Sequence, residues 1–151
     1  MKKLFCILCT FLLIFTMTAC GGSREPQTAT LELSVDGVTI SYTLEAKGDI
    51  VQTMTQTSTL EKAAFTYADV DSFEASFAEY QALYNAIEGV TYSTESTDTE
   101  LIETIVMDVS DSDTLEALVD QGLLPVEGNT KRISLSGTVE SLESQGWIVT
   151  E

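Results

Sequence analysis

Two runs of alternating apolar and polar residues meet at Asp36-Gly37, and this junction restricts the fold more than any other stretch. Apolar residues occupy every second position from Leu31 to Val35 and again from Val38 to Leu44. Alternation with a period of two is typical of a strand that has one buried face. Asp-Gly supplies two residues that tolerate the positive φ of a tight hairpin turn. The sequence therefore predicts an antiparallel hairpin over residues 31–45.

A third strand is predicted after the turn at residues 47–49, and it runs from Ile50 to about Leu60. Ile50, Met54 and Leu60 mark its apolar face. The opposite face carries a row of threonines: Thr53, Thr55, Thr57 and Thr59. Such a row could template a ligand. Threonine also has high β-propensity and suits the solvated face of an antiparallel sheet, and we favour that interpretation.

Beyond residue 66 the apolar period changes to that of a helix. Five large side chains recur at spacings of four and three: Phe73, Phe77, Tyr80, Tyr84 and Ile87. This stripe indicates an amphipathic helix that covers the sheet, although an aromatic stripe can also line a ligand pocket. Asp71 with Glu74 fits a capping box at the helix start, and Gly89 fits the left-handed position after its end.

The second half of the chain predicts another hairpin and two short helices. The hairpin joins residues 90–94 to residues 101–109 through a polar connection. The helices are predicted over 113–122 and 138–146, each with a polar first residue and a closing glycine. Trp147 then begins a last short strand and is expected to pack under the sheet.

Together these elements predict an α+β fold. We expect an antiparallel sheet built from an N-terminal three-strand meander and a second hairpin, covered on one face by one long and two short helices. Residues 29–151 are expected to form this fold as a single domain.

The first nineteen residues have the layout of a secretory signal. A basic start precedes an apolar run over residues 4–17, which as a helix covers only about 21 Å of a hydrocarbon core of about 30 Å. Residues 17–20, Met-Thr-Ala-Cys, resemble the lipobox of bacterial lipoproteins. The resemblance implies cleavage after Ala19 and a diacylglyceryl group on Cys20. We therefore expect a lipid anchor on Cys20 at the extracytoplasmic face of the cell membrane, with residues 20–28 as a tether.

Charge and side-chain chemistry exclude several classes of function. Two of the seven basic residues and none of the twenty-four acidic ones lie in the leader, so the mature chain has a net charge of −19. This charge opposes binding to nucleic acid, because affinity for phosphates comes from Lys and Arg. The chain has no histidine, and Cys6 and Cys9 lie in the leader. With Cys20 acylated, no thiol, disulfide or zinc cluster remains.

No cofactor and no catalytic motif is indicated by the sequence, so we expect a protein that is not an enzyme. A hydrolase that uses only two carboxylates is one alternative, because two acids at a fixed separation suffice to cleave a glycosidic bond. The sequence does not select two of its twenty-four acids for that role.

One acidic stretch, residues 108–113, invites a metal interpretation. Calcium binds several oxygen ligands, and the candidate ligands are Asp108, Asp111, Asp113 and Glu116. The spacing does not match an EF-hand loop. Asp113 with Glu116 also fits a capping box at the start of a helix, and we favour that interpretation. A divalent-cation-binding module is nevertheless kept as an alternative function.

The order of the predicted motifs, strands and helices along the chain is a recognisable pattern. It comprises the lipobox cysteine, three early strands, an aromatic helix ending in residues 87–90, a polar hairpin ending near Asp108, and a closing segment over 134–147. This pattern resembles the YehR-like family of small bacterial lipoproteins. The resemblance implies an α+β domain and an extracytoplasmic address, and it brings no established activity and no catalytic residues. The expected function is a membrane-anchored, non-enzymatic binding or accessory module, whose protein or small-molecule partner is unspecified.

Overall fold

The computed structural model describes residues 25–124 and 131–150. The leader, Cys20 and residues 21–24 of the tether lie outside these ranges. The strands are β1 (Pro26–Val35), β2 (Val38–Lys47), β3 (Ile50–Glu61), β4 (Val90–Ser96), β5 (Glu100–Asp108) and β6 (Ile148–Val149), and the helices are α1 (Tyr67–Tyr84), α2 (Ser112–Asp120) and α3 (Leu135–Ser144), with a 3₁₀ turn, η1 (Lys62–Ala64).

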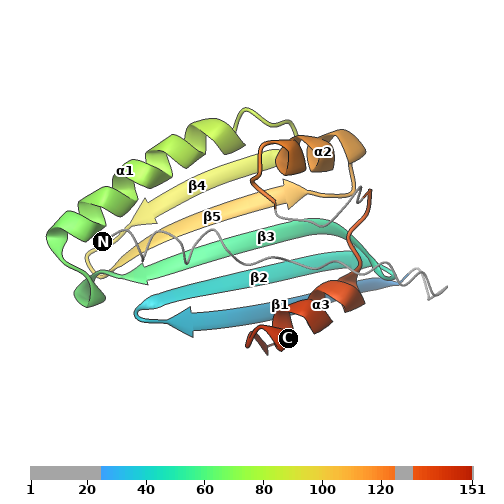
Figure 1. Cartoon of the computed structure of the whole chain (residues 1–151), viewed down its shortest axis with the longest axis horizontal. Coiled ribbons are helices and arrows are strands. Elements are labelled where there is room, and N and C mark those ends of the chain that lie inside the picture. The colour runs from blue at the N-terminus through green and yellow to red at the C-terminus, as the bar shows by residue number, and fades with distance from the viewer. Residues whose placement is uncertain (1–24, 125–130, 151) are drawn as a thin grey trace.

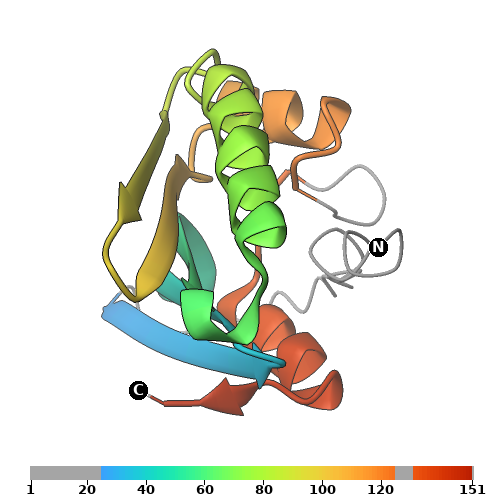
Figure 2. The same ribbon diagram turned by 90° about the vertical axis from the view of Figure 1, so that its left-hand side faces the viewer.

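Within the described residues the six strands form one antiparallel sheet in the order β4-β5-β3-β2-β1-β6 (Figure 1). All three α-helices lie on the same face of this sheet (Figure 2). The predicted α+β class, the three-strand meander and the second hairpin are therefore confirmed.

The first hairpin turns at Asp36-Gly37 as the sequence predicts. Both residues have positive φ, 51° for Asp36 and 82° for Gly37, and Val35 pairs directly with Val38. Positive φ at both central positions matches the right-handed twist of the flanking strands. The first strand is longer than predicted. It begins at Pro26, five residues before the alternation starts at Leu31. The last three residues assigned to the tether therefore belong to the sheet.

The predicted inner face of β3 needs one correction. The register between β2 and β3 shifts at Glu45/Ala46, which marks a β-bulge. An irregularity of this kind changes which side chains point inward. Val51 and Met54 are both fully buried, whereas Ile50 is only half-buried. The threonine row lies on the face of β3 away from the helices, as the favoured interpretation predicts, and its four side chains are half-buried.

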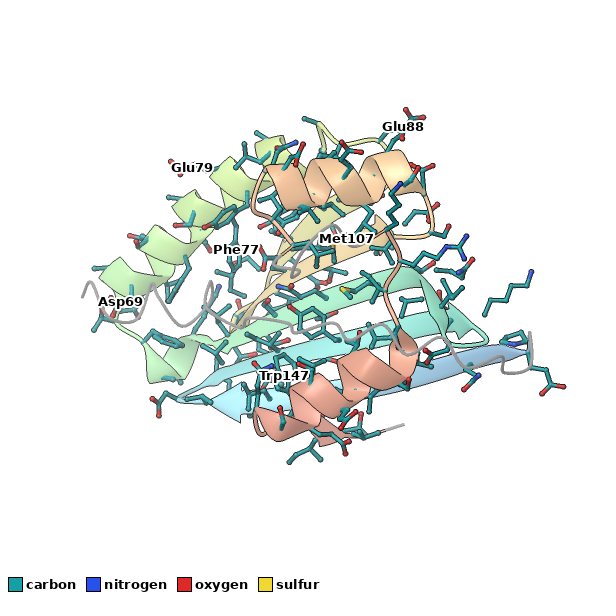
Figure 3. The ribbon with its side chains drawn as sticks, turned by 45° about the vertical axis from the view of Figure 1, so that its right-hand side comes forward. Asp69, Phe77, Glu79, Glu88, Met107 and Trp147 are labelled. Atoms are coloured by element: carbon teal, nitrogen blue, oxygen red, sulfur yellow. The ribbon has the colours of Figure 1, made fainter. Side chains whose placement is uncertain are left out.

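The aromatic stripe of α1 packs onto the sheet, which confirms its predicted role. Phe77, Tyr84 and Ile87 are buried, and Phe73 and Tyr80 are partly buried against the same core. In Figure 3, Phe77 and Met107 point into the layer between helix and sheet, whereas Glu79 and Glu88 point to the surface.

All three helices begin earlier than predicted. The capping box of α1 is formed by Thr66 and Asp69 rather than by Asp71 and Glu74. In each case an upstream residue in extended conformation accepts the hydrogen bond from the amide three positions later. The caps of α2 and α3 are Asp111 and Ser134, in place of the predicted Asp113 and Thr138. Helix α1 also ends earlier than predicted, at Tyr84 with Asn85 as its C-cap, and Gly89 lies beyond it.

A long-range contact positions α3. The carboxylate of Asp49, in the turn between β2 and β3, accepts hydrogen bonds from Ser134 Oγ at 2.7 Å and from the Ser136 N–H at 2.8 Å. Partial burial acts to raise the pKa of Asp49, but the hydrogen bonds from Ser134 and Ser136 together lower it below its usual value. The charged form is therefore favoured, and it stabilises the first turn of α3.

The helices pack on strands near the two edges of the sheet more than on its central strands. Helix α1 packs mainly on β4, α2 on β5, and α3 on β1 and β6. No helix makes a comparable set of contacts with β2 or β3 in the described part of the chain. The middle of the helix-side face is filled by side chains of β2 and β3 themselves, among them the fully buried Leu44 and Met54.

The hairpin turn gives a first prediction. A Cβ at position 37 would overlap the Cβ of Ala64, whereas a Cβ at position 122 would meet nothing within 4 Å, and both glycines have positive φ. We expect Gly122→Ala to lower the free energy of unfolding by about 1–2 kcal/mol through backbone strain alone. Gly37→Ala should lower it by about 2–4 kcal/mol, because overpacking adds to the strain. Urea unfolding measures both, and equal losses would contradict the close packing of η1 on the turn.

Candidate functional site

Five polar side chains form a strip across the helix-side face of the sheet. They are Tyr42 on β2, Gln56 and Ser58 on β3, Glu103 on β5, and Tyr92 on β4. Tyr42 pairs with Gln56 in the register of β2 and β3, and Ser58 pairs with Glu103 in that of β3 and β5. We call this set the polar strip.

Hydrogen bonds connect the polar strip from end to end. Tyr42 Oη donates to Gln56 Oε1 at 3.0 Å, and Gln56 Nε2 donates to Ser58 Oγ at 3.3 Å. Ser58 hydrogen-bonds to the carboxyl group of Glu103, and Tyr92 Oη donates to Glu103 Oε1. Four strands thus contribute to one network in which each polar group has a partner.

Glu103 is the most unusual member of the polar strip. Only 3% of its surface is exposed, and its neighbours along β5 on the same face are Leu101 and Ile105. Burial raises the pKa of Glu103, and the hydrogen bonds from Tyr92 and Ser58 lower it without cancelling that rise. A carboxyl group in this environment is more readily protonated than an exposed one.

The two tyrosines at the ends of the strip are also perturbed. The pKa of Tyr42 and that of Tyr92 are both raised. Burial is the larger cause, and the nearby Glu103 is the smaller one. Both phenols therefore keep their protons near neutral pH and act as hydrogen-bond donors. The ring of Tyr42 also contacts Trp147, with centroids 5.0 Å apart, and Trp147 is only 4% exposed. The predicted packing of Trp147 under the sheet is confirmed.

Glu103 is a site residue that motifs and composition do not reveal. The apolar residues Leu101, Ile105, Met107 and Val109 stand at odd positions of the second hairpin. A period of two places residue 103 on the same side as these residues, between two apolar neighbours. An acid inside an apolar period was therefore the signal that could have found it.

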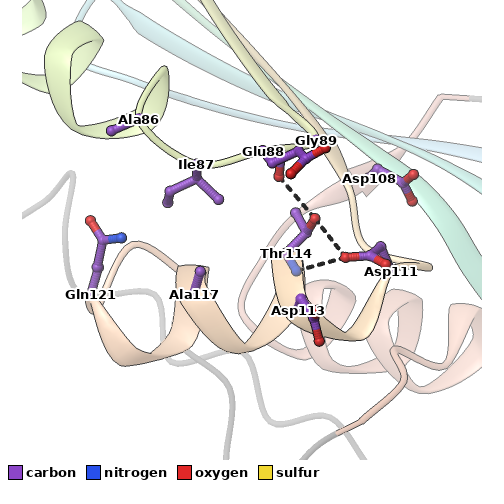
Figure 4. Close-up of a pocket in the computed structure, with 10 residues that line it drawn as sticks. All are labelled: Ala86, Ile87, Glu88, Gly89, Asp108, Asp111, Asp113, Thr114, Ala117 and Gln121. Atoms are coloured by element: carbon purple, nitrogen blue, oxygen red, sulfur yellow. Dashed lines mark hydrogen bonds between the residues drawn. The ribbon is translucent and has the colours of Figure 1, made fainter.

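A second feature is an acidic pocket of about 620 Å³ between α2 and the turn that links α1 to β4. Figure 4 shows Glu88, Asp108, Asp111 and Asp113 around it. Three of the four candidate metal ligands thus lie around one pocket. The fourth, Glu116, is not among the residues that line it.

The acids of this pocket already take part in local hydrogen bonds. Asp111 Oδ1 accepts from the Thr114 N–H at 2.9 Å, which caps α2, and hydrogen bonds from Thr114 lower the pKa of Asp111. Asp108 Oδ1 accepts from the N–H and the hydroxyl of Ser110 at 3.0 and 2.7 Å. Across residues 25–124 and 131–150, no three acidic, histidine or cysteine side chains gather closely enough to share a metal ion.

Comparisons with known proteins give family and fold. A family described as Protein of unknown function (DUF1307) matches residues 27–148. An uncharacterised lipoprotein of Listeria monocytogenes is 27% identical over 147 residues, which cover 97% of this chain and 95% of the relative. An uncharacterised lipoprotein of Listeria innocua is 26% identical over the same shares of each chain.

Two solved structures share the fold. The NMR structure of the Escherichia coli YehR protein has a TM-score of 0.64 and 19% identity, and the match covers 84% of this chain and 92% of that one. The NMR structure of a protein from Streptococcus pneumoniae has a TM-score of 0.52 and 16% identity, over 89% of this chain and 91% of that one.

The buried carboxyl gives a second prediction. Tyr92→Phe removes the hydroxyl that donates to Glu103, so we expect the free energy of unfolding to fall by about 1–2 kcal/mol. The pKa of Glu103 should rise further, because the bond from Tyr92 lowers it. Urea unfolding and carboxyl ¹³C NMR measure the two effects. Tyr67→Phe is the matched control, since the Tyr67 side chain is 93% exposed, and an equal effect there would contradict the role of Tyr92.

Proposed function

This chain belongs to the DUF1307 family, a YehR-like group of uncharacterised lipoproteins, and we propose that it is a lipid-anchored module outside the cytoplasmic membrane that works by binding. The anchor is the diacylglyceryl group of Cys20. The binding surface is the half-buried end of the polar strip, formed by Tyr42 and Gln56, and its partner is positively charged.

The extent of the matches to the Listeria lipoproteins supports the anchor. Each match covers 97% of this chain, so it passes through residues 17–20, where the lipobox resemblance lies. A diacylglyceryl group supplies two acyl chains, which are enough for stable attachment. Among the described residues, no helix has the length and apolar character needed to cross a membrane.

The anchor also limits the reach of the domain. Strand β1 begins at Pro26, six residues after Cys20. A fully extended chain covers at most about 3.6 Å per residue, so the first strand starts within about 22 Å of the anchor. The domain therefore meets partners that are at the membrane surface or close to it.

The observation that carries the binding proposal is the buried carboxyl of Glu103 in the centre of a polar network. Replacing both partners of a buried hydrogen bond with apolar groups of the same shape can be nearly neutral or stabilising. Stability alone is therefore a weak reason for its presence, and perturbed acids tend to cluster at functional sites. Tyr42 and Gln56 are half-buried and lie on strands that the helices contact little, so this end of the strip is where a partner makes contact.

Charge supports the choice of partner. The mature chain has a net charge of −19, which attracts cationic groups and repels anionic ones. The strip adds one carboxyl group, Glu103, and no basic side chain. A hydrolase with two carboxylates finds no second acid within the strip itself, so binding fits this set of side chains better than hydrolysis.

The anchor gives a third prediction. In the native host, we expect Cys20→Ala to release the protein from the membrane fraction, or to leave the leader attached. Mass spectrometry of the wild-type protein should find an N-terminal peptide that starts at Cys20 and carries two or more acyl chains. Ser23→Ala is a control that leaves the lipobox intact. An unmodified Cys20 in the wild-type protein would overturn the anchor.

The binding surface gives a fourth prediction. A photoreactive phenylalanine derivative is placed at Tyr42, or at Ser41, whose side chain lies on the opposite face of the same strand. On intact membranes, we expect a discrete crosslinked product from position 42 and none from position 41. Added oligolysine should reduce that product. Equal labelling from both positions, or no labelling from position 42, would contradict the proposed surface.

A further inference from the structure

Glu103 is connected to the ends of two helices through a pair of tyrosines. Tyr92 donates to Glu103 through its hydroxyl, and its ring stacks on Tyr84 of α1 with centroids 5.5 Å apart and an interplanar angle of 18°. The N–H of Tyr92 donates to Asn85 Oδ1, at the end of α1, at 2.9 Å. Tyr84 Oη donates to the carbonyl of Leu123, shortly after α2, at 3.4 Å.

The same helix ends form the walls of the acidic pocket. Residues 86–89, which follow Asn85 directly, line one side of it, and Thr114, Ala117 and Gln121 of the α2 segment line the other (Figure 4). The two walls are joined by Thr114, whose hydroxyl lies 2.9 Å from the Glu88 carbonyl. A change at Glu103 can therefore reach the pocket through Tyr92 and Tyr84.

The groups that face Glu103 in the described parts of the chain are hydroxyls. They are Ser58 from β3, Tyr92 from β4 and Tyr42 from β2, with Tyr80 and Tyr84 of α1 close to Tyr92. No positive charge among them offsets the cost of burying a carboxylate. That cost falls only if the group is neutral or if water reaches it.

We propose that Glu103 is a proton-operated latch that holds the ends of α1 and α2, and with them the walls of the acidic pocket, against the sheet. In the protonated state the carboxyl O–H donates to Ser58 Oγ, and Oε1 accepts from Tyr92. When the proton leaves to bulk water, the carboxylate gains stability from hydration. The hydrogen bonds from Tyr92 and Ser58 favour the carboxylate but do not offset its burial. Water must therefore reach it, and the movement of Tyr92 and Tyr84 that admits this water loosens both helix ends.

The direction of the pH dependence follows from the raised pKa of Glu103. The folded protein binds this proton more tightly than the unfolded chain. The contribution to stability is therefore complete below the unfolded pKa of about 4.5, and it is lost as the pH rises through the folded pKa. Asp49 and Asp111 have lowered pKa values and act in the opposite direction. A comparison of variants at each pH removes these shared contributions.

The fifth prediction uses Glu103→Gln, which keeps the shape of the side chain and is neutral at every pH. Relative to wild type, we expect its folding equilibrium constant to rise about tenfold for each unit by which the folded pKa of Glu103 exceeds 4.5. The rise should begin above pH 4.5 and level off above the folded pKa of Glu103, as measured by urea unfolding over a series of pH values. Glu61→Gln is the matched control, because Glu61 is exposed at the end of β3, and its profile should parallel that of wild type.

Hydrogen exchange followed by mass spectrometry tests whether the effect reaches the helices. Above the folded pKa of Glu103 we expect amides of residues 84–89 and 114–121 to exchange faster in wild type than in Glu103→Gln, and below pH 4.5 we expect them to exchange equally. A difference confined to β4 and β5 would overturn the latch. So would parallel stability profiles for the two proteins.

A direct measurement covers the case in which Glu103→Gln does not fold. The carboxyl ¹³C resonance of Glu103 in the wild-type protein should titrate above pH 4.5. A midpoint at or below that value would overturn the latch. None of these measurements requires the lipid anchor or a binding partner, so the latch can fail while the proposed function stands, and the reverse also holds.

Discussion

The covering of the sheet on one face only is the constraint on which the rest of the structure depends. Strands β1 to β5 turn their buried side chains toward the helices. The three cysteines of the chain lie at or before residue 20. The described domain therefore has no disulfide, and burial of this one face must supply its stability. The threonine row on the opposite face is free to be polar because none of the described helices packs against it.

The position of the helices explains where polar groups can enter the core. Helices α1, α2 and α3 pack mainly on strands toward the two sides of the sheet, and the centre is left to side chains that reach across it. Tyr42, Gln56 and Ser58 occupy that centre and satisfy one another before the network reaches Glu103. A partly satisfied network would be costly in this environment. The polar strip is thus a complete unit, which is consistent with the roles proposed for it in binding and in pH response.

Local sequence signals predicted some features and missed others for identifiable reasons. The Asp36-Gly37 turn and the stripe from Phe73 to Ile87 depend on residues that are close in the chain, and both are confirmed. The helix starts were placed too late because several Ser, Thr and Asp residues precede each helix, and backbone conformation decides which one caps it. Glu103 was missed although its position in the alternation was visible, because an acid is rarely fully buried.

The sequence by itself determined the strands, the amphipathic helices, the acidic charge and the resemblance that led to the family, because each of these depends on composition or on neighbouring residues. Only the tertiary structure decided that β3 pairs with β5, that a bulge turns Val51 inward, and that Glu103 lies between Ser58 and Tyr92. The register between strands distant in the chain is set by packing of the whole buried face, and a shift of one residue would send Glu103 to the solvent side.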